Sequence, residues 1–204
     1  MSTKKSAATT PNKKASTGSE LVAVGIFTVI ILVIHTLCNI IGVLGPEVQP
    51  FGGVVAVIIN GIPFMLFLRR IHHFGLITSM TLLISVVLVL MGHHPIGIPL
   101  ALACGLIADI IVTSGTFAHR NRNILGYAFF ALYPMSGIFP LLFMRHQLIE
   151  MYTKQADAHW AQSFSDFFSA PMVFGIGAGC FIAGLIGGWL GQRLVRTYFS
   201  RAGL

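Results

Sequence analysis

The sequence is poor in charged residues, which make up only 9% of its 204 positions, whereas 55% are hydrophobic. A soluble domain typically carries about 25% charged residues, so most of this chain has too little polar surface to face water. The sequence contains no G-x-x-x-x-G-K-[ST] loop, no G-x-S-x-G and no H-E-x-x-H motif. The chain therefore has no P-loop with which to hydrolyse ATP, and we expect no enzymatic activity from it.

Cysteine is scarce as well. Cys38, Cys104 and Cys180 lie far apart, each within an apolar segment. They have neither the spacing of metal ligands nor that of a disulfide framework. We interpret them as small packing residues and predict neither a metal site nor a bound cofactor.

Long apolar segments dominate the rest of the chain. Each is close to the length of about 20 residues that a helix needs to cross a hydrocarbon layer about 30 Å thick. The sequence therefore predicts an all-α integral membrane protein with six transmembrane helices, forming one membrane domain over residues 21–204. Residues 1–20 are basic and rich in Ser, Thr and Ala, and we predict that they form a disordered cytoplasmic tail. The predicted spans are 21–44, 51–68, 74–92, 96–117, 123–144 and 170–192.

The positions of the basic residues predict an orientation. If the N-terminus is cytoplasmic, eleven of the 13 Lys and Arg residues fall on the cytoplasmic side, and only Arg145 and Lys154 fall outside. Cytoplasmic segments of membrane proteins carry an excess of Lys and Arg. We therefore predict that both ends of the chain are cytoplasmic. This bias explains the net charge of +7 better than nucleic-acid binding does.

Small residues recur every four positions along the sixth predicted span. Such a stripe removes side chains from one helix face and allows neighbouring backbones to approach closely. We predict that it packs inside the chain's own bundle, with a subunit-contact face as the alternative. The stripe and its adjoining row comprise Gly175, Gly179, Ala183, Gly184, Gly187, Gly188 and Gly191.

Two other residue types are unusual inside the predicted spans. Pro63, Pro134 and Pro140 lie within apolar segments and are predicted to kink them. Asp109 lies in the inner half of the fourth span, where an ionised carboxylate near the centre costs about 2.5–3.5 kcal/mol. Asp109 could be neutral, paired with an arginine of the following loop, or in contact with a partner subunit. We do not expect it to bind substrate.

Polar residues gather toward the outer ends of the predicted spans. His35 and Asn39 are four residues apart and share a face of the first span, and Tyr133 lies within the fifth. His93 and His94 belong to the GHHP segment that follows the third span. Because burying polar groups in lipid is costly, we hypothesise that these five residues line a substrate-binding cavity that opens outward. The alternative is that each one hydrogen-bonds to a neighbouring helix.

The connection between the fifth and sixth spans is long, running from Arg145 to about Asp166. We predict that part of it is a surface helix with an aromatic side that includes Tyr152, His159 and Trp160. Anchoring at the membrane interface is the more common reason for such residues. The functional interpretation is a lid over the cavity, which adds Arg145, His159 and Trp160 to the candidate substrate-binding residues.

Four segments, GHHP, GLIADII, NRNILGYAFFALYPMSGIFPLLFMR and GGWLGQRLVRTYFSRAGL, resemble the MptD (Trep_Strep) family of energy-coupling factor (ECF) transporter S components. The resemblance extends from about Leu21 to the C-terminus. It implies a six-helix S component in the cell membrane of a prokaryote, which captures a vitamin-like or other trace nutrient from outside. In such importers the substrate lies near the outer helix ends and the loops after spans one, three and five.

The resemblance also implies partners: a transmembrane coupling subunit and two cytoplasmic ATPase subunits. Many S components meet the coupling subunit through an A-x-x-x-A pattern on the first helix. Here Ala23 is followed four residues later by Phe27, so the pattern is incomplete. The small residues Ala23, Gly25 and Thr28 are the candidates for this contact.

A self-sufficient secondary transporter or channel is the alternative function. Such carriers usually contain two related halves, and we find no repeat that relates residues 21–92 to 96–192. The substrate is left open. Eight His and eight Met residues would suit a ligand that contains haem or a metal, whereas a flat aromatic vitamin would suit Tyr152 and Trp160.

Overall fold

The computed structural model describes residues 17–45, 47–155 and 158–199, and these residues form helices and the turns between them. Most of the predicted tail lies outside the described residues, but the first helix begins at Thr17, so residues 17–20 are helical. The elements are α1 (Thr17–Asn39), η1 (Ile40–Leu44), α2 (Gln49–Leu68), α3 (Leu76–Leu90), η2 (Pro95–Gly97), α4 (Ile98–Ser114), α5 (Arg120–Phe130), α6 (Met135–Ile138), α7 (Leu141–Gln155), α8 (Ala158–Phe167), α9 (Ala170–Leu194) and η3 (Val195–Phe199).

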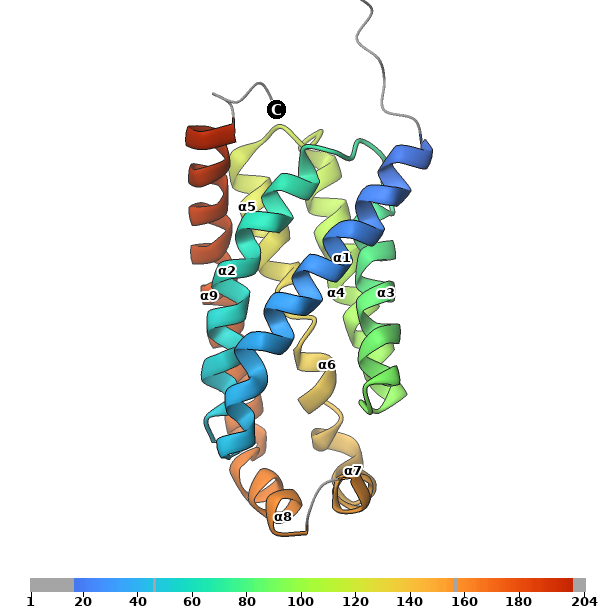
Figure 1. Cartoon of the computed structure of the whole chain (residues 1–204), viewed down its shortest axis with the longest axis vertical. Coiled ribbons are helices and arrows are strands. Elements are labelled where there is room, and N and C mark those ends of the chain that lie inside the picture. Colours follow the sequence, from blue (N-terminus) through green and yellow to red (C-terminus); the bar gives the residue numbers. More distant parts are fainter. Residues whose placement is uncertain (1–16, 46, 156–157, 200–204) are drawn as a thin grey trace, which may run out of the picture.

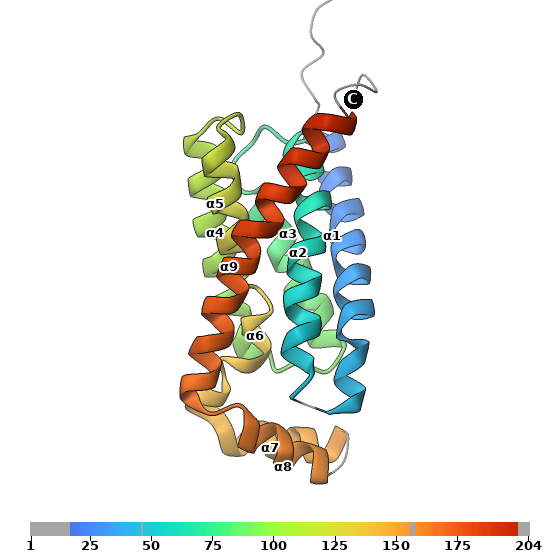
Figure 2. The ribbon, with the colours of Figure 1, turned by 90° about the vertical axis from the view of Figure 1, so that its left-hand side faces the viewer.

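The helices form a closed ring in the order α1, α2, α9, α5, α4 and α3, and α3 packs back against α1 (Figures 1 and 2). The N-terminus of α1 and the C-terminus of α9 lie at the same end of the bundle, which we call the proximal end. Helices α7 and α8 lie across the opposite end, which we call the distal end. The described residues therefore form the all-helical bundle that the apolar pattern predicted.

Among the described residues, fewer helices than the predicted six are long and apolar enough to cross a membrane. Within the described residues, four helical segments are long and apolar enough to cross a membrane: Thr17–Leu44, Gln49–Leu68, Pro95–Ser114 and Ala170–Tyr198. A bent pair, Arg120–Ile138 with Leu141–Lys154, makes a fifth if it is counted as one span. The predicted third span contains α3, whose 15 residues extend only about 22 Å at about 1.5 Å per residue.

The fifth predicted span, 123–144, is broken at its prolines. Helix α5 ends at Phe130, Pro134 precedes α6, and Pro140 separates α6 from α7. The two parts of the bent pair differ in direction by 52°. Proline has no N–H to donate and clashes with the preceding turn, so the interruptions predicted at these two residues are confirmed. Pro63, by contrast, lies inside the continuous helix α2.

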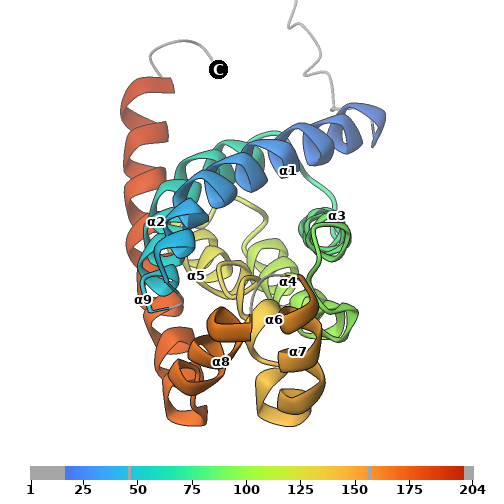
Figure 3. The ribbon, with the colours of Figure 1, turned by 60° about the horizontal axis from the view of Figure 1, so that its bottom comes forward.

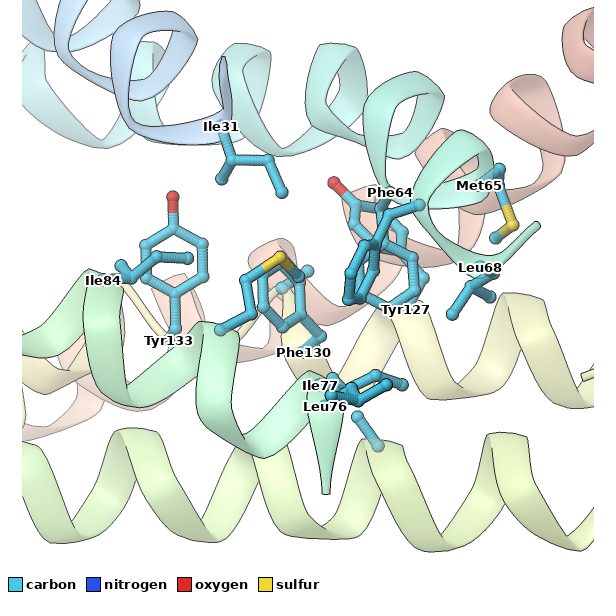
Figure 4. Close-up of a cluster of buried hydrophobic side chains, with 14 of the residues drawn as sticks. Ile31, Phe64, Met65, Leu68, Leu76, Ile77, Ile84, Tyr127, Phe130 and Tyr133 are labelled. Carbon is cyan, nitrogen blue, oxygen red and sulfur yellow. The ribbon is translucent and has the colours of Figure 1, made fainter. Parts of the chain in front are cut away.

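The main core lies in the middle of the ring and is rich in aromatic rings (Figure 4). The ring centroid of Phe64 is 4.9 Å from that of Tyr127 and 4.7 Å from that of Phe130. The hydroxyl of Tyr127 donates to the Val57 carbonyl, and thus ties α5 to α2. Lipid is as apolar as these side chains, so close packing and interhelical hydrogen bonds hold such a bundle together.

The small-residue stripe of α9 packs closely in its proximal half. A Cβ atom at Gly61 of α2 would lie 2.1 Å from the Gly187 carbonyl oxygen, and one at Gly191 would lie 2.2 Å from the Gly61 carbonyl oxygen. On the adjoining row, a Cβ at Gly184 would lie 2.8 Å from the Cα of Ala128 in α5. At these positions the stripe packs inside the chain's own bundle. Ala183 and Gly188 are buried as well, and a Cβ at Gly188 would lie 3.3 Å from the Cα of Ile124 in α5.

Gly175 and Gly179 do not share this packing, and for them the prediction is wrong. A Cβ atom at either position would meet no atom within 4 Å. The reason is helical geometry: at 3.6 residues per turn, each four-residue step rotates a position by about 40° around the helix axis. Over the steps from Gly191 back to Gly175 the stripe therefore turns by about 160°, away from α2.

Two buried carboxylates join helices near the proximal end. Asp109 in α4 accepts hydrogen bonds from the backbone N–H of Thr78 at 2.9 Å and from its hydroxyl at 2.8 Å. Thr78 is in the first turn of α3, whose N-cap, Gly75, has no side chain that could satisfy these N–H groups. Asp109 thus caps a neighbouring helix. Glu20 in α1 similarly accepts from the backbone N–H of His72 at 2.9 Å.

Candidate functional site

Figure 3 brings the distal end forward and shows α7 and α8 lying across it. Residues of these two helices and of the ring helices line a cavity of about 210 Å³ at this end. We call it the distal cavity. Its lining combines polar side chains from α1, α2 and the turn after α3 with apolar and aromatic side chains from α6 to α9. The lining residues are His35, Asn39, Gln49, Pro50, Gly53, His93, Pro134, Met135, Gly137, Ile138, Tyr152, Trp160, Phe164, Phe168, Ile176 and Cys180.

Helix α1 supplies His35 and Asn39 from its last turns, where the predicted shared face is present. The side-chain N–H of Asn39 donates to the His35 carbonyl at 2.8 Å. This bond fixes the orientation of the amide and leaves its Oδ1 as a hydrogen-bond acceptor. The Nδ1 atom of His35 is buried and finds no partner among the described residues.

His93 reaches the cavity from the turn after α3. Its Nδ1 lies 3.0 Å from the Leu88 carbonyl oxygen, and because a carbonyl can only accept, Nδ1 carries a proton. Burial lowers the pKa of His93, and the hydrogen bond to Leu88 opposes this shift. The ring is therefore neutral near pH 7, which makes Nε2 an acceptor. The edge that carries Nε2 faces Gly137, whose Cβ would lie 3.5 Å from that nitrogen.

Helix α2 contributes Gln49 and Gly53, which sequence reasoning missed. The buried Oε1 of Gln49 finds no partner among the described residues. A Cβ atom at Gly53 would have Asn39 Oδ1 as its one neighbour within 4 Å, at 3.9 Å. Gln49 lies at the edge of the loop LGPEVQP, and a polar residue at the start of a span on the same side as Asn39 was the available signal.

The α7–α8 unit, which we call the cover, places aromatic rings over the cavity. The rings of Trp160 and Phe164 are stacked, with centroids 5.0 Å apart and planes 20° apart. Tyr152 meets Phe164 edge-on at 5.1 Å. These side chains belong to a hydrophobic cluster separate from the main core, built on Met135 of α6 and Val173 of α9. The aromatic rings of the cover therefore pack in a second hydrophobic cluster and not in the main core.

Arg145 links α7 to α8 through hydrogen bonds and does not line the cavity. Its Nε donates to the Ser165 hydroxyl at 2.9 Å, and its terminal nitrogen donates to the Ser165 carbonyl. His94 does not line the cavity either: its Nδ1 accepts from the Ile96 N–H at 3.2 Å and caps η2. His159 is exposed in α8, outside the lining.

Four of the eight predicted substrate-binding residues thus meet in one cavity, and their role in binding stays a prediction. They are His35, Asn39, His93 and Trp160. Tyr133 lies directly behind them, with its ring centroid 5.4 Å from that of His35. Its buried hydroxyl also lacks a partner among the described residues.

The predicted subunit-contact residues of α1 divide into two groups. Ala23 and Thr28 are buried inside the chain's own bundle. A Cβ atom at Gly25 would meet no atom within 4 Å, so this position is open to a neighbour. Large apolar side chains such as Ile26 and Val29 are exposed on the same helix.

The distal cavity has a lining suited to a small ligand. No Asp, Glu, Lys or Arg side chain is among its described lining residues. Across residues 17–45, 47–155 and 158–199, no group of three or more His, Cys, Asp or Glu side chains could hold a metal ion. A few convergent polar groups in an otherwise apolar pocket are the usual features of a small-molecule site.

Comparison with known proteins gives one match. A family model described as a hypothetical bacterial integral membrane protein (Trep_Strep) matches residues 18–201. No curated protein and no solved structure matches the chain. The description of the matching family specifies a bacterial membrane protein and names no activity.

Proposed function

We propose that this chain, which belongs to the Trep_Strep family of bacterial integral membrane proteins, is the S component of an ECF-type ABC importer in the cell membrane. In this proposal the distal end faces outward, and the distal cavity captures a vitamin-like or other trace nutrient. A transmembrane coupling subunit and two cytoplasmic ATPases drive uptake. The chain itself performs no catalytic step.

One observation carries the proposal: unpartnered polar atoms converge beneath an aromatic cover in a cavity at the distal end. Buried polar groups in proteins nearly always have a hydrogen-bond partner, and an orphaned one costs about 1–3 kcal/mol. His35 Nδ1 and Gln49 Oε1 are two such atoms in the lining. A bound ligand would supply the missing partners. The positive-inside pattern supports the same orientation, because among the Lys and Arg residues that the structure describes only Arg145 and Lys154 lie near the distal end.

The absence of a P-loop from the sequence supports a separate energy source. For the coupling subunit we propose a docking face on α1 around Gly25, where the backbone is open and the neighbouring side chains Ile26 and Val29 are exposed and apolar. Close helix approach at small residues is common in membranes. Ala23 and Thr28 would support this face from inside the bundle.

Reconstitution into liposomes tests the proposal. The chain alone is expected to bind its ligand without accumulating it against a gradient, and accumulation is expected only when coupling and ATPase subunits are added with ATP. The ligand is first identified by mass spectrometry of the material that co-purifies with the chain. Sustained accumulation by the chain alone would favour a secondary transporter instead.

A further inference from the structure

Three polar side chains in the lining of the distal cavity present a hydrogen-bond acceptor, and a fourth, His35, presents an unpartnered Nδ1. Asn39 presents Oδ1 and one remaining N–H, because its other N–H donates to the His35 carbonyl. His93 presents Nε2, because its Nδ1 is engaged with the Leu88 carbonyl. Gln49 presents an Oε1 atom that has no partner among the described residues. Acceptors cannot bond to one another, so the ligand that satisfies them must donate hydrogen bonds.

The charge of the lining restricts the ligand further. The lining that the structure describes contains no ammonium or guanidinium group. Of the cations of α7, Arg145 is engaged with Ser165 and Lys154 lies outside the lining. A carboxylate or phosphate would therefore lose its hydration here and meet acceptor atoms, which repel it. A permanent cation would lose its hydration as well, without a carboxylate to pair with.

The aromatic cover and the size of the cavity indicate the shape of the ligand. Tyr152, Trp160, Phe164 and Phe168 present rings to the cavity, and rings stack favourably on flat π-systems. A volume of about 210 Å³ is below the 300–1,000 Å³ typical of sites for drug-sized ligands. One or two fused rings suit this space better than a macrocycle.

We infer that the distal cavity binds a small, uncharged, flat nitrogen heterocycle that offers two or more N–H groups, as ring N–H or as amino or carboxamide substituents. This inference rests on the proposed function, since it identifies the substrate class of the same site. In the bound state the N–H groups donate to Asn39 Oδ1, Gln49 Oε1 and His93 Nε2, and the ring lies against the aromatic cover.

Fluorescence of Trp160 provides a direct test on the purified full chain in nanodiscs. The chain has two tryptophans, and the variant Trp189→Phe isolates the signal of Trp160. The probes are adenine and nicotinamide, which are uncharged and carry N–H groups. Their matched controls are 6-dimethylamino-9-methylpurine, which has no N–H, and nicotinate, which is a carboxylate.

We expect both adenine and nicotinamide to quench Trp160, and each control to bind at least about tenfold more weakly, since each lost net hydrogen bond is worth about 1 kcal/mol. The variant Gly53→Leu, which fills the cavity, should abolish the quenching. Nicotinate or the methylated purine binding as tightly as its partner would overturn the inference, and so would the absence of quenching by both N–H probes at millimolar concentration.

The two proposals fail in different ways. A co-purifying molecule that is anionic or has no N–H donor, and that displaces adenine and nicotinamide from the cavity, would refute this ligand class. ATP-dependent accumulation of that molecule would still support the S-component function. Accumulation by the chain alone would refute the S-component function and leave the ligand class unaffected.

Discussion

Gly52 and Gly53 are neighbours in α2 with opposite surroundings. A Cβ atom at Gly52 would lie 2.3 Å from the Cys38 carbonyl oxygen of α1, whereas one at Gly53 would have a single neighbour at 3.9 Å, in the distal cavity. Gly53→Leu is expected to fold like the parent and to lose ligand binding, and Gly52→Leu is expected to disrupt the contact between α1 and α2. Ligand titration and the yield of monodisperse protein check this pair. Undiminished ligand affinity in folded Gly53→Leu would show that the ligand lies elsewhere.

Asp109 illustrates a residue whose role is structural despite its cost in a membrane. It satisfies the Thr78 N–H in the first turn of α3, as an N-cap side chain would. We expect Asp109→Ala to lose about 1–2 kcal/mol of unfolding free energy, measured by denaturant titration in mixed micelles. Asp109→Asn keeps an oxygen acceptor and should lose less. Equal stability of all three proteins would rule out this capping role.

The stripe on α9 allows a matched test within one helix. Gly187 meets the backbone of α2, where a Cβ would lie 2.8 Å from the Ile58 carbonyl oxygen, whereas Gly175 faces open space. Gly187→Leu should therefore lower the yield of folded protein strongly, because overpacking costs about 1–3 kcal/mol or more. Gly175→Leu should have little effect. Similar yields from both variants would contradict the close contact between α2 and α9.

The sequence predicted the long apolar helices well, because hydrophobicity over about 20 residues is a strong local signal. It also predicted the breaks at Pro134 and Pro140, whose cause is local as well. The rotation of the stripe follows from the helical repeat. Which of its glycines meet α2, and the capping of α3 by Asp109 of α4, depend on how helices lie in three dimensions. No periodicity within a single segment reports such contacts.

For the candidate site, too, sequence analysis found the residues with a strong local signal and missed those that depend on the three-dimensional arrangement. Asn39 and His35 could be found because polar residues stand out in an apolar span. Gln49 was missed because it lies in the polar segment LGPEVQP, where its position beside a span is a weak signal. Arg145 was expected to bind substrate because a cation near the outer surface suggests a ligand contact. Its partner Ser165 is 20 positions away in the sequence, so the hydrogen bonds could not be foreseen.

Across the molecule as a whole, the orientation in the membrane is the first property to test. Ala118 and Thr153 are exposed, at the proximal and the distal end respectively. With Cys38, Cys104 and Cys180 replaced, Thr153→Cys should react with an impermeant maleimide in intact cells. Ala118→Cys should react only after permeabilisation. Both substitutions preserve every Lys and Arg, so they leave the charge bias intact. The reverse labelling pattern would exclude the cytoplasmic placement of the two ends.

The distal cavity as the ligand site is the central claim, and the most direct test is the dissociation constant of the co-purified ligand for three histidine variants. His35→Ala and His93→Ala each remove a group from the cavity and should weaken binding by roughly 5- to 150-fold, as expected for about 1–3 kcal/mol. His94→Ala is the matched control, because His94 caps η2 outside the lining, and it should bind like the parent. If His35→Ala and His93→Ala remain folded and bind the ligand as the parent does, the distal cavity is not the ligand site.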